Sequence, residues 1–427
     1  MDTPLRANRS FRLYFVARIV SQLGDQLYVF AISWFVLDLT QSSFHMAALL
    51  AINALAAMAA APIGGLIADR VSRKAILVVT DVVQGGVLIA LLAFQQAHLL
   101  SLGMLYAGTV LLGLCSAVFS PAAGAIIPGI VGKEHVPPAV AAGQAASNVC
   151  TIAGMLLGGA MYGLVGITGV LAFNAACNLV AAGMQSRIQV SRFEIAPGAA
   201  AGPAGVFREL RDGLRHVRAD RAVFALLLVN TVFTLAALPI AMVSMPYLFN
   251  VILGASPAQA AFPQAAIWAG IILGSAAAAR LMKTRRRPET LIAGGLLALA
   301  IHSVLMVALV GGRAMLGPQG MSVACTLANL VAGAAAAFFV VPTYSLFHAR
   351  TAEQFRGRFW GLEGALRTAA MCAGYFFAGA LAQRLPLEAV YAETGVMLAI
   401  LGVVVMRLKA SQAAAYGKTA SAVAPPR

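Results

Sequence analysis

The chain has 427 residues, of which 60% are hydrophobic and 11% are charged, and its mean hydropathy is +0.85. A soluble domain carries roughly 25% charged residues, so this composition excludes an ordinary soluble protein. Apolar runs longer than about 18 residues recur along the whole chain and predict a multi-pass α-helical membrane protein. A β-barrel is excluded, because barrel strands alternate apolar and polar residues while these runs are continuous.

The apolar runs predict about twelve membrane spans in two halves of equal size. The first half is predicted at 1–186 and the second at 222–409, with a cytoplasmic linker at 187–221 and a disordered tail at 410–427. The predicted spans are 12–38, 44–68, 75–96, 99–124, 138–165, 168–186, 222–250, 257–282, 289–311, 318–344, 357–383 and 387–408.

The formal net charge of +15 follows the predicted topology. Of the 30 Lys and Arg residues, all but Arg18, Arg313, Arg367 and Arg384 lie on the same side as the N-terminus. This is the positive-inside distribution, which predicts that both termini lie in the cytoplasm. The excess charge therefore indicates no nucleic-acid partner.

The linker between the halves has two parts. Residues 196–205 are rich in Gly, Ala and Pro and predict a flexible connection. Residues 207–221 repeat apolar side chains at helical spacing, with arginines on the other faces. We expect an amphipathic helix on the inner membrane surface; a solvated linker helix is the alternative.

The first span is unusually polar. Arg18, Gln22, Asp25 and Gln26 lie near one helical face. Arg18, Gln22 and Gln26 are candidates for the wall of a substrate cavity, although Arg18 lies nearer the cytoplasm and could instead extend to the membrane interface. An ionised carboxylate near the bilayer centre costs about 2.5–3.5 kcal/mol, so Asp25 should face a cavity. It is a candidate for coupling to protons or substrate, with a purely structural partner role as the alternative.

The fifth span carries a stripe of uncharged polar residues, which suits a cavity wall or polar packing between helices. The stripe consists of Gln144, Ser147, Asn148 and Thr151. The same span holds Gly154 and Gly158, a spacing typical of close helix packing.

The eleventh span carries Glu363 and Arg367 at i,i+4, the favourable order for an ion pair within a helix. The alternative interpretation makes Glu363 a second protonatable site and Arg367 a contact for an anionic substrate. Asn230 in the seventh span is a weaker candidate for a cavity residue.

The sequence contains no nucleophile elbow, Walker loop, zinc-ligand spacing or calcium loop. We therefore expect no enzyme activity, no cofactor and no metal site. Two six-span halves around a central cavity are a common transporter plan. The energy for transport should come from an ion gradient, most simply from protons that move inward through Asp25 or Glu363. We expect a monomer that binds a small-molecule substrate within the lipid bilayer.

The stretch Gly64–Lys74 (GGLIADRVSRK), between the second and third spans, resembles the loop signature of the major facilitator superfamily. A weaker echo follows the eighth span, where Gly270 and Gly274 precede basic residues but Ala279 stands in place of the acid. The resemblance implies two pseudo-symmetric six-helix halves that alternate their access. It also implies a cytoplasmic gate, to which we assign Gly65, Asp69, Arg70, Arg73 and Asp81.

Further stretches resemble one branch of that superfamily, which holds siderophore exporters, macrolide efflux pumps and lysophospholipid transporters. These stretches are Phe11–Asp25, Gly129–Val136 and Arg356–Ala365. The resemblance implies proton-driven siderophore export across the bacterial cytoplasmic (inner) membrane, with multidrug or macrolide efflux and lysophospholipid transport as alternatives. A receptor or scaffold that does not transport is a different class, which would not need ionisable groups within its spans.

Overall fold

The computed structural model describes residues 8–190, 211, 214–215, 217–218, 220–283, 288–351 and 353–422. Within these ranges, the side chains of Leu66, Ala68, Asp69, Lys133, Leu238, Gln354 and residues 408–422 are not described. The described chain is helical throughout, and eleven of its helices are long and apolar enough to cross a membrane. This confirms the predicted all-α membrane fold.

The helices follow the predicted spans closely. Their bounds are α1 Arg9–Thr40, α2 Ser43–Arg70, α3 Arg73–Gln96, α4 Leu102–Val131, η1 Lys133–His135, α5 Val136–Gln185, α7 Arg221–Tyr247, η2 Leu248–Ile252, α8 Pro257–Lys283, α9 Pro288–Gly311, α10 Arg313–Arg350, η3 Glu353–Phe355, α11 Arg356–Arg384 and α12 Leu387–Ala422. Serine side chains cap the N-termini of α2, α3 and α4, where the first backbone N–H groups of a helix otherwise lack acceptors.

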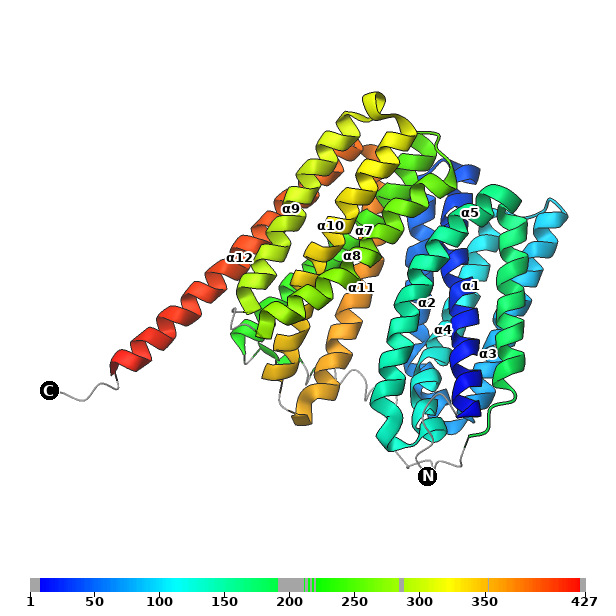
Figure 1. The fold of residues 1–427 in the computed structure, drawn as a ribbon, viewed down its shortest axis with the longest axis horizontal. Coiled ribbons are helices and arrows are strands. Elements are labelled where there is room, and N and C mark those ends of the chain that lie inside the picture. The colour runs from blue at the N-terminus through cyan, green and yellow to red at the C-terminus, as the bar shows by residue number, and fades with distance from the viewer. Residues whose placement is uncertain are drawn as a thin grey trace. The chain divides into compact units, whose positions relative to one another are not determined.

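Helix α5 accounts for two of the twelve predicted spans. It has 50 residues, but Gly166 within it adopts a positive φ of 63° that interrupts the helical geometry. Figure 1 shows the chain reversing direction there, so the parts before and after Gly166 run antiparallel. A positive φ favours glycine, because other residues pay a steric penalty in this region. The predicted fifth and sixth spans, 138–165 and 168–186, meet at this turn.

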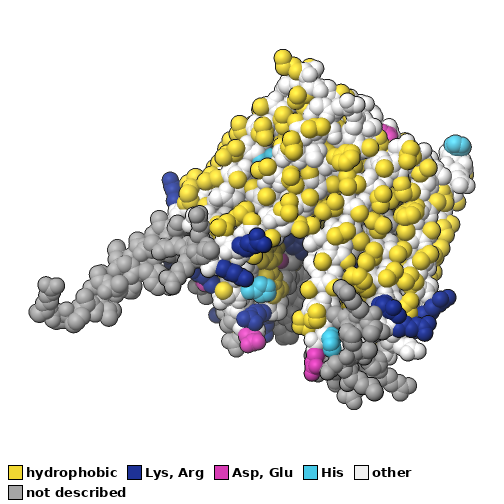
Figure 2. All heavy atoms as spheres, viewed as in Figure 1, with side chains coloured by type: hydrophobic (Ala, Val, Ile, Leu, Met, Phe, Trp, Pro, Cys, Tyr) yellow, Lys and Arg dark blue, Asp and Glu magenta, His cyan; other side chains and the backbone are white. Residues whose placement is uncertain are grey.

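The chain forms two compact units. Unit 1 comprises Met1–Arg208, Pro239–Ala265 and Met371–Arg384, and unit 2 comprises Glu209–Leu238, Ala266–Ala370 and Leu385–Arg427. Unit 1 thus contains α1 to α5, the C-terminal end of α7 with η2, the N-terminal end of α8 and the C-terminal end of α11. In Figure 2, hydrophobic side chains cover the sides of the unit 1 helices, and Lys and Arg side chains gather at their lower end.

Glycines bring α1 and α5 together within unit 1. A Cβ atom on Gly154 would lie 2.5 Å from the Cβ of Gln26, and one on Gly158 would lie 2.8 Å from the carbonyl oxygen of Leu27. These distances leave no room for a side chain. The GxxxG spacing of the fifth span is therefore a close-packing motif, as predicted.

Unit 2 packs α8 against α10 in the same way. Cβ atoms on Gly270 and Gly333 would lie 2.1 Å and 2.0 Å from backbone carbonyl oxygens of the facing helix. Its hydrophobic core contains Phe339, Phe347 and Phe359, each at most 1% exposed.

Part of the predicted amphipathic helix contacts this core. Val217 is 2% exposed, and Leu214 packs beside it. The guanidinium of Arg218 lies 5.9 Å from the ring centroid of Phe224. Most of 187–221 lies outside the described residues, so a location of this segment on the membrane surface stays a prediction.

The C-terminal segment differs from the sequence expectation. Helix α12 continues to Ala422, through most of the range 410–427 for which we expected a disordered tail, and 423–427 lie outside the described residues. The segment is rich in alanine, which has the highest intrinsic helix propensity, and this accounts for the continued helix.

Candidate functional site

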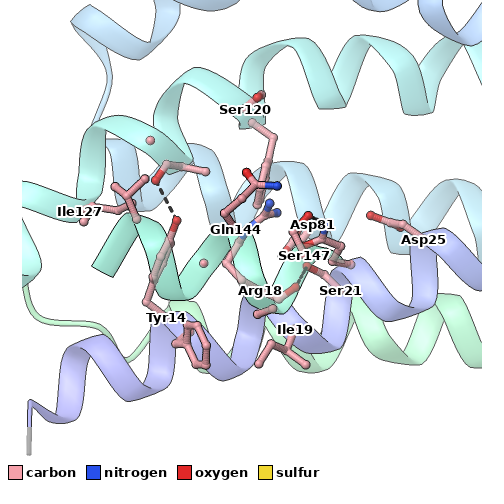
Figure 3. Close-up of a pocket in the computed structure, with 18 of the residues that line it drawn as sticks. Tyr14, Arg18, Ile19, Ser21, Asp25, Asp81, Ser120, Ile127, Gln144 and Ser147 are labelled. Carbon is pink, nitrogen blue, oxygen red and sulfur yellow. Dashed lines mark hydrogen bonds between the residues drawn. The ribbon is translucent and has the colours of Figure 1, made fainter. Parts of the chain in front are cut away.

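Unit 1 contains a partly open cavity of about 400 Å³ between α1, α3, α4 and α5, lined by both polar and apolar side chains (Figure 3). Its lining includes one guanidinium and two carboxyl groups, namely those of Arg18, Asp25 and Asp81. Aromatic rings line the same space, and the Tyr14 hydroxyl donates a hydrogen bond of 2.8 Å to the carbonyl of Ala123. The cavity therefore combines a charged region with an apolar wall.

Asp25 faces this cavity and contacts the second part of α5. The side-chain amide of Asn178 donates to its carboxylate at 3.5 Å and to the side-chain oxygen of Asn174 at 3.1 Å. Both asparagines are at most 1% exposed. Gly24, just before Asp25, makes this approach possible, because a Cβ there would lie 2.4 Å from Asn174 Oδ1.

Asp81 lies on α3, 1% exposed, and lines the same cavity. The amide of Gln185, itself fully buried, donates to its carboxylate at 2.8 Å. We predicted Asp81 in the cytoplasmic gate. Its location beside Arg18 and Asp25 makes it part of the charged region of the cavity, and a gating role stays a prediction.

Arg18 is the cation of the cavity. Its guanidinium lies 4.8 Å from the ring centroid of Phe119, within the range of a cation–π contact. None of the ion pairs within 4.0 Å among the described residues includes Arg18. Figure 3 shows Asp81 between Arg18 and Asp25, in agreement with the electrostatic interaction of Asp81 with both residues.

The predicted polar residues separate into two groups. Gln22, Gln26 and Gln144 line the cavity, and the Gln22 amide donates to the Ser147 hydroxyl. Asn148 and Thr151 are not among the lining residues. The Asn148 side chain accepts from Gln144 at 3.3 Å, and the Thr151 hydroxyl donates to the Ser147 carbonyl of its own helix at 3.0 Å.

A second polar cluster lies within unit 2 and is centred on Glu363, which is 3% exposed. One oxygen of its carboxylate accepts from the Tyr344 hydroxyl at 2.7 Å and from the Asn230 amide at 3.3 Å. Arg367 pairs with the same oxygen at 3.6 Å, one helical turn away. The predicted i,i+4 pair is therefore present, and α7 and α10 each contribute a hydrogen-bond donor to the carboxylate.

We expect Tyr344→Phe to weaken the function of Glu363 without unfolding the protein. Phenylalanine keeps the ring, which stacks on Trp360 with centroids 5.6 Å apart, and removes only the hydroxyl that donates to the carboxylate. A hydrogen bond to a charged group contributes about 1.5–3 kcal/mol. The activity of the protein should fall, while the melting temperature stays within a few degrees of wild type. Wild-type activity of the variant would contradict a role for Tyr344 at Glu363.

The predicted gate residues other than Asp81 lie at the hairpin between α2 and α3. Gly64 makes the close approach, since a Cβ there would lie 2.3 Å from the Ala117 carbonyl oxygen, whereas Gly65 has nothing within 4 Å. Arg73 donates to the Ala125 carbonyl on α4 at 2.8 Å, and Arg70 is exposed. The Asp69 side chain lies outside the described residues.

Four residues that contact the candidate carboxylates are absent from the residues predicted from the sequence, namely Asn174, Asn178, Gln185 and Tyr344. Three of them share a face of the second part of α5, because steps of four and seven residues return to nearly the same side of a helix. Buried amides along one face of an apolar span are a signal that the sequence contains. Tyr344 has no comparable signal.

Comparison with known proteins decides the family. The family model of the Major Facilitator Superfamily matches residues 14–327. The chain belongs to this superfamily. Its members are transporters, and the chain is accordingly a multi-pass membrane transporter of small molecules.

Relatives and solved structures extend over nearly the whole chain. An uncharacterized transporter of the same superfamily, YfiS of Bacillus subtilis (strain 168), is 24% identical over 95% of this chain and 95% of its own. Macrolide efflux protein A of Streptococcus pyogenes is 19% identical over 92% of this chain and 94% of its own.

Two solved structures share the fold at low sequence identity. The crystal structure of a bacterial homologue of the iron transporter ferroportin, in an inward-facing state, has a TM-score of 0.71 at 13% identity and covers 94% of this chain and 99% of its own. The nucleoside transporter NupG has a TM-score of 0.68 at 13% identity and covers 94% of this chain and 98% of its own. At this sequence identity, the similarity to the two structures supports a shared fold and nothing further.

Proposed function

We propose that this protein is a proton-driven efflux transporter for amphiphilic small molecules in the bacterial cytoplasmic membrane, with both termini in the cytoplasm. The observation that carries the proposal is Asp25, a carboxylate that lines a cavity within a membrane span and has no ion pair among the described residues. An ionisable side chain within a membrane span is energetically unfavourable, so such residues are rare and usually mark a functional site.

Glu363 is the second proposed proton site. Its carboxylate is buried and has an arginine at 3.6 Å, so protonation would release Arg367 from the pair. If protonation of Glu363 and binding of substrate both shift the equilibrium between the two conformations of the transporter, the two binding events are thermodynamically linked.

The relatives and the lining of the cavity favour a drug-like substrate over a siderophore. Macrolide efflux proteins are related to the chain over most of its length. The aromatic wall suits a large apolar body, and the serine and glutamine side chains suit its hydroxyl and ether oxygens. Siderophore export is the second candidate function, supported by Arg18, whose guanidinium would contact an anionic chelator.

The test is transport by a strain that lacks its own efflux pumps and expresses this protein. We expect lower accumulation of erythromycin than in the empty-vector strain, and loss of the difference when a protonophore collapses the proton gradient. The same cells, grown without iron, report siderophore in the medium and in the cytoplasm. Protonophore-sensitive secretion of siderophore without a change in erythromycin would favour the second candidate, and no change in either would contradict the proposal.

A further inference from the structure

We propose that the Trp360 ring seals the Glu363 carboxylate from the cytoplasmic ends of α10 and α11, so that protons reach this carboxylate from the side of Arg367. The inference rests on the proposed function, in which Glu363 is a proton site, and adds the side from which the site is reached. It follows from the ring contacts of Trp360, the burial of Glu363 and the exposure of Arg367.

The seal lies about one helical turn from the acid. Trp360 precedes Glu363 by three residues on α11, so the two side chains share a face, and Trp360 lies about 4.5 Å nearer the N-terminal end of the helix. On α10, His348 follows Tyr344 by four residues and lies nearer the C-terminal end. The proposed topology places both of these ends in the cytoplasm. Trp360 and His348 are therefore on the cytoplasmic side of the carboxylate.

The indole of Trp360 packs among four other rings. It stacks on Tyr344 with centroids 5.6 Å apart and an angle of 13° between the planes, and it lies 4.5 Å from the imidazole of His348. It also contacts Phe359 at 5.3 Å and Phe347 at 6.5 Å, and both of these phenylalanines are at most 1% exposed. Buried water requires several polar partners, which the faces of these rings do not offer. The layer formed by the five rings therefore opposes a continuous file of water from the helix ends to the carboxylate.

Tyr344 joins this ring layer to the acid. Its ring stacks on Trp360, while its hydroxyl donates to the Glu363 carboxylate at 2.7 Å. The Asn230 amide of α7 donates to the same carboxylate oxygen at 3.3 Å, and Glu363 is 3% exposed. The contacts that bury the acid thus continue into the ring layer. Removal of the indole would uncover the tyrosine and, next to it, the carboxylate.

Arg367 lies on the other side of the acid. Its side chain is 46% exposed, whereas that of Glu363 is 4% exposed. It follows Glu363 by one turn, on the side away from Trp360, and its Nε lies 3.6 Å from the carboxylate oxygen. None of the ion pairs within 4.0 Å in the described chain joins Arg367 to another acid. Water beside the exposed guanidinium is therefore close to the carboxylate, and a proton can transfer there when the pair opens.

The seal bears directly on coupling. A transporter with alternating access exposes its binding site to one side of the membrane at a time. A permanent water path between the cytoplasm and Glu363 would let a proton leave in every conformation, which would dissipate the gradient without moving substrate. With the seal in place, loss of the proton depends on access from the side of Arg367, which can change with the conformation of the protein.

The experiment measures how fast Glu363 reacts with a water-soluble carbodiimide and glycinamide in the purified full-length protein, with the product quantified by mass spectrometry. Trp360→Ala should raise this rate by at least about tenfold, because truncation of a packed indole leaves a cavity beside polar groups that water can fill. Trp360→Phe keeps an aromatic ring and should react at nearly the wild-type rate. The exposed Glu134 provides a reference rate within each sample.

Two further variants separate the seal from stability. Trp360→Leu fills more space than alanine but cannot stack, and it should react at a rate between those of wild type and Trp360→Ala. It also serves as the test if the alanine variant does not fold. The matched control is Trp34→Ala, which removes another packed indole, 3% exposed and stacked on Phe30 in unit 1. It should leave the rate at Glu363 unchanged, and an equal rise in this control would overturn the inference.

Liposomes that contain the protein and an internal pH-sensitive dye test the consequence for proton movement. Without substrate, Trp360→Ala should dissipate an imposed proton gradient faster than wild type, and the added change Glu363→Gln should remove this leak. An unchanged reaction rate at Glu363 in the alanine and leucine variants would overturn the seal and leave the proposed function intact. A faster reaction without any leak would support the seal and contradict Glu363 as a proton site.

Discussion

Asp25→Asn is expected to reduce the proposed proton-driven efflux strongly while leaving the protein folded. The amide is close in size to the carboxylate and keeps a polar group next to Asn178, but it cannot take up or release a proton. Coupling free energies between two sites are typically about 1–3 kcal/mol, so we expect gradient-driven efflux to fall by about 5- to 150-fold.

Everted membrane vesicles provide the measurement. A proton gradient of fixed size is imposed, uptake of a radiolabelled substrate is followed, and exchange of labelled for unlabelled substrate is recorded without a gradient. We expect the variant to lose the first activity and to retain the second, since exchange does not require net proton movement. Glu134→Gln is the control, since this carboxylate is exposed and lies outside the cavity. Wild-type gradient-driven uptake by Asp25→Asn would remove Asp25 from the coupling mechanism.

Gly333→Leu is expected to prevent unit 2 from folding. A Cβ atom at this residue would lie 2.0 Å from the carbonyl oxygen of Ile267, and backbone cannot move aside as a flexible side chain can. Overpacking a core typically costs about 1–3 kcal/mol, and the clash of a whole leucine with facing backbone should exceed this range. The same interface contains Gly270, whose Cβ would lie 2.1 Å from the Leu330 carbonyl oxygen, so α8 cannot retreat without losing both contacts.

The measurement is the yield of monodisperse protein on size-exclusion chromatography together with its melting temperature. Gly294→Leu on α9 is the matched control, because nothing lies within 4 Å of a Cβ at that glycine. Replacing glycine within a helix typically adds up to about 1 kcal/mol, so the control should be as stable as wild type or slightly more stable. Wild-type yield and melting temperature for Gly333→Leu would show that the α8–α10 contact is looser than the structure indicates.

The sequence contained the information for the spans because hydropathy is a local property. Twenty or so apolar residues must form a helix in a membrane, whatever the rest of the chain does. The turn at Gly166 was located between the predicted spans 138–165 and 168–186 for the same reason. The charged hairpin at Gly64–Lys74 was sufficient to indicate the superfamily, which the match over residues 14–327 then established.

The sequence predicts only some of the residues of the candidate site. The polar face of the first span predicted that Arg18 and Asp25 would face a cavity, because a charge in a membrane must avoid lipid. The identity of their neighbours depends on which helices pack together, and sequence spacing does not record that. Asn178 is 153 residues from Asp25 along the chain and donates to it, and Gln185 is 104 residues from Asp81.

The sequence by itself determined that this chain is a helical membrane protein of one superfamily, since span length, apolar content and a short charged loop are read locally. Tertiary structure alone decided that Asp81 lines the cavity of Arg18 and Asp25, that Tyr344 and Asn230 hold Glu363, and that Gly64 rather than Gly65 makes the close helix contact. These facts depend on the rotation of each helix about its own axis. That rotation is set by the sum of side-chain contacts with several neighbours, most of them distant in sequence.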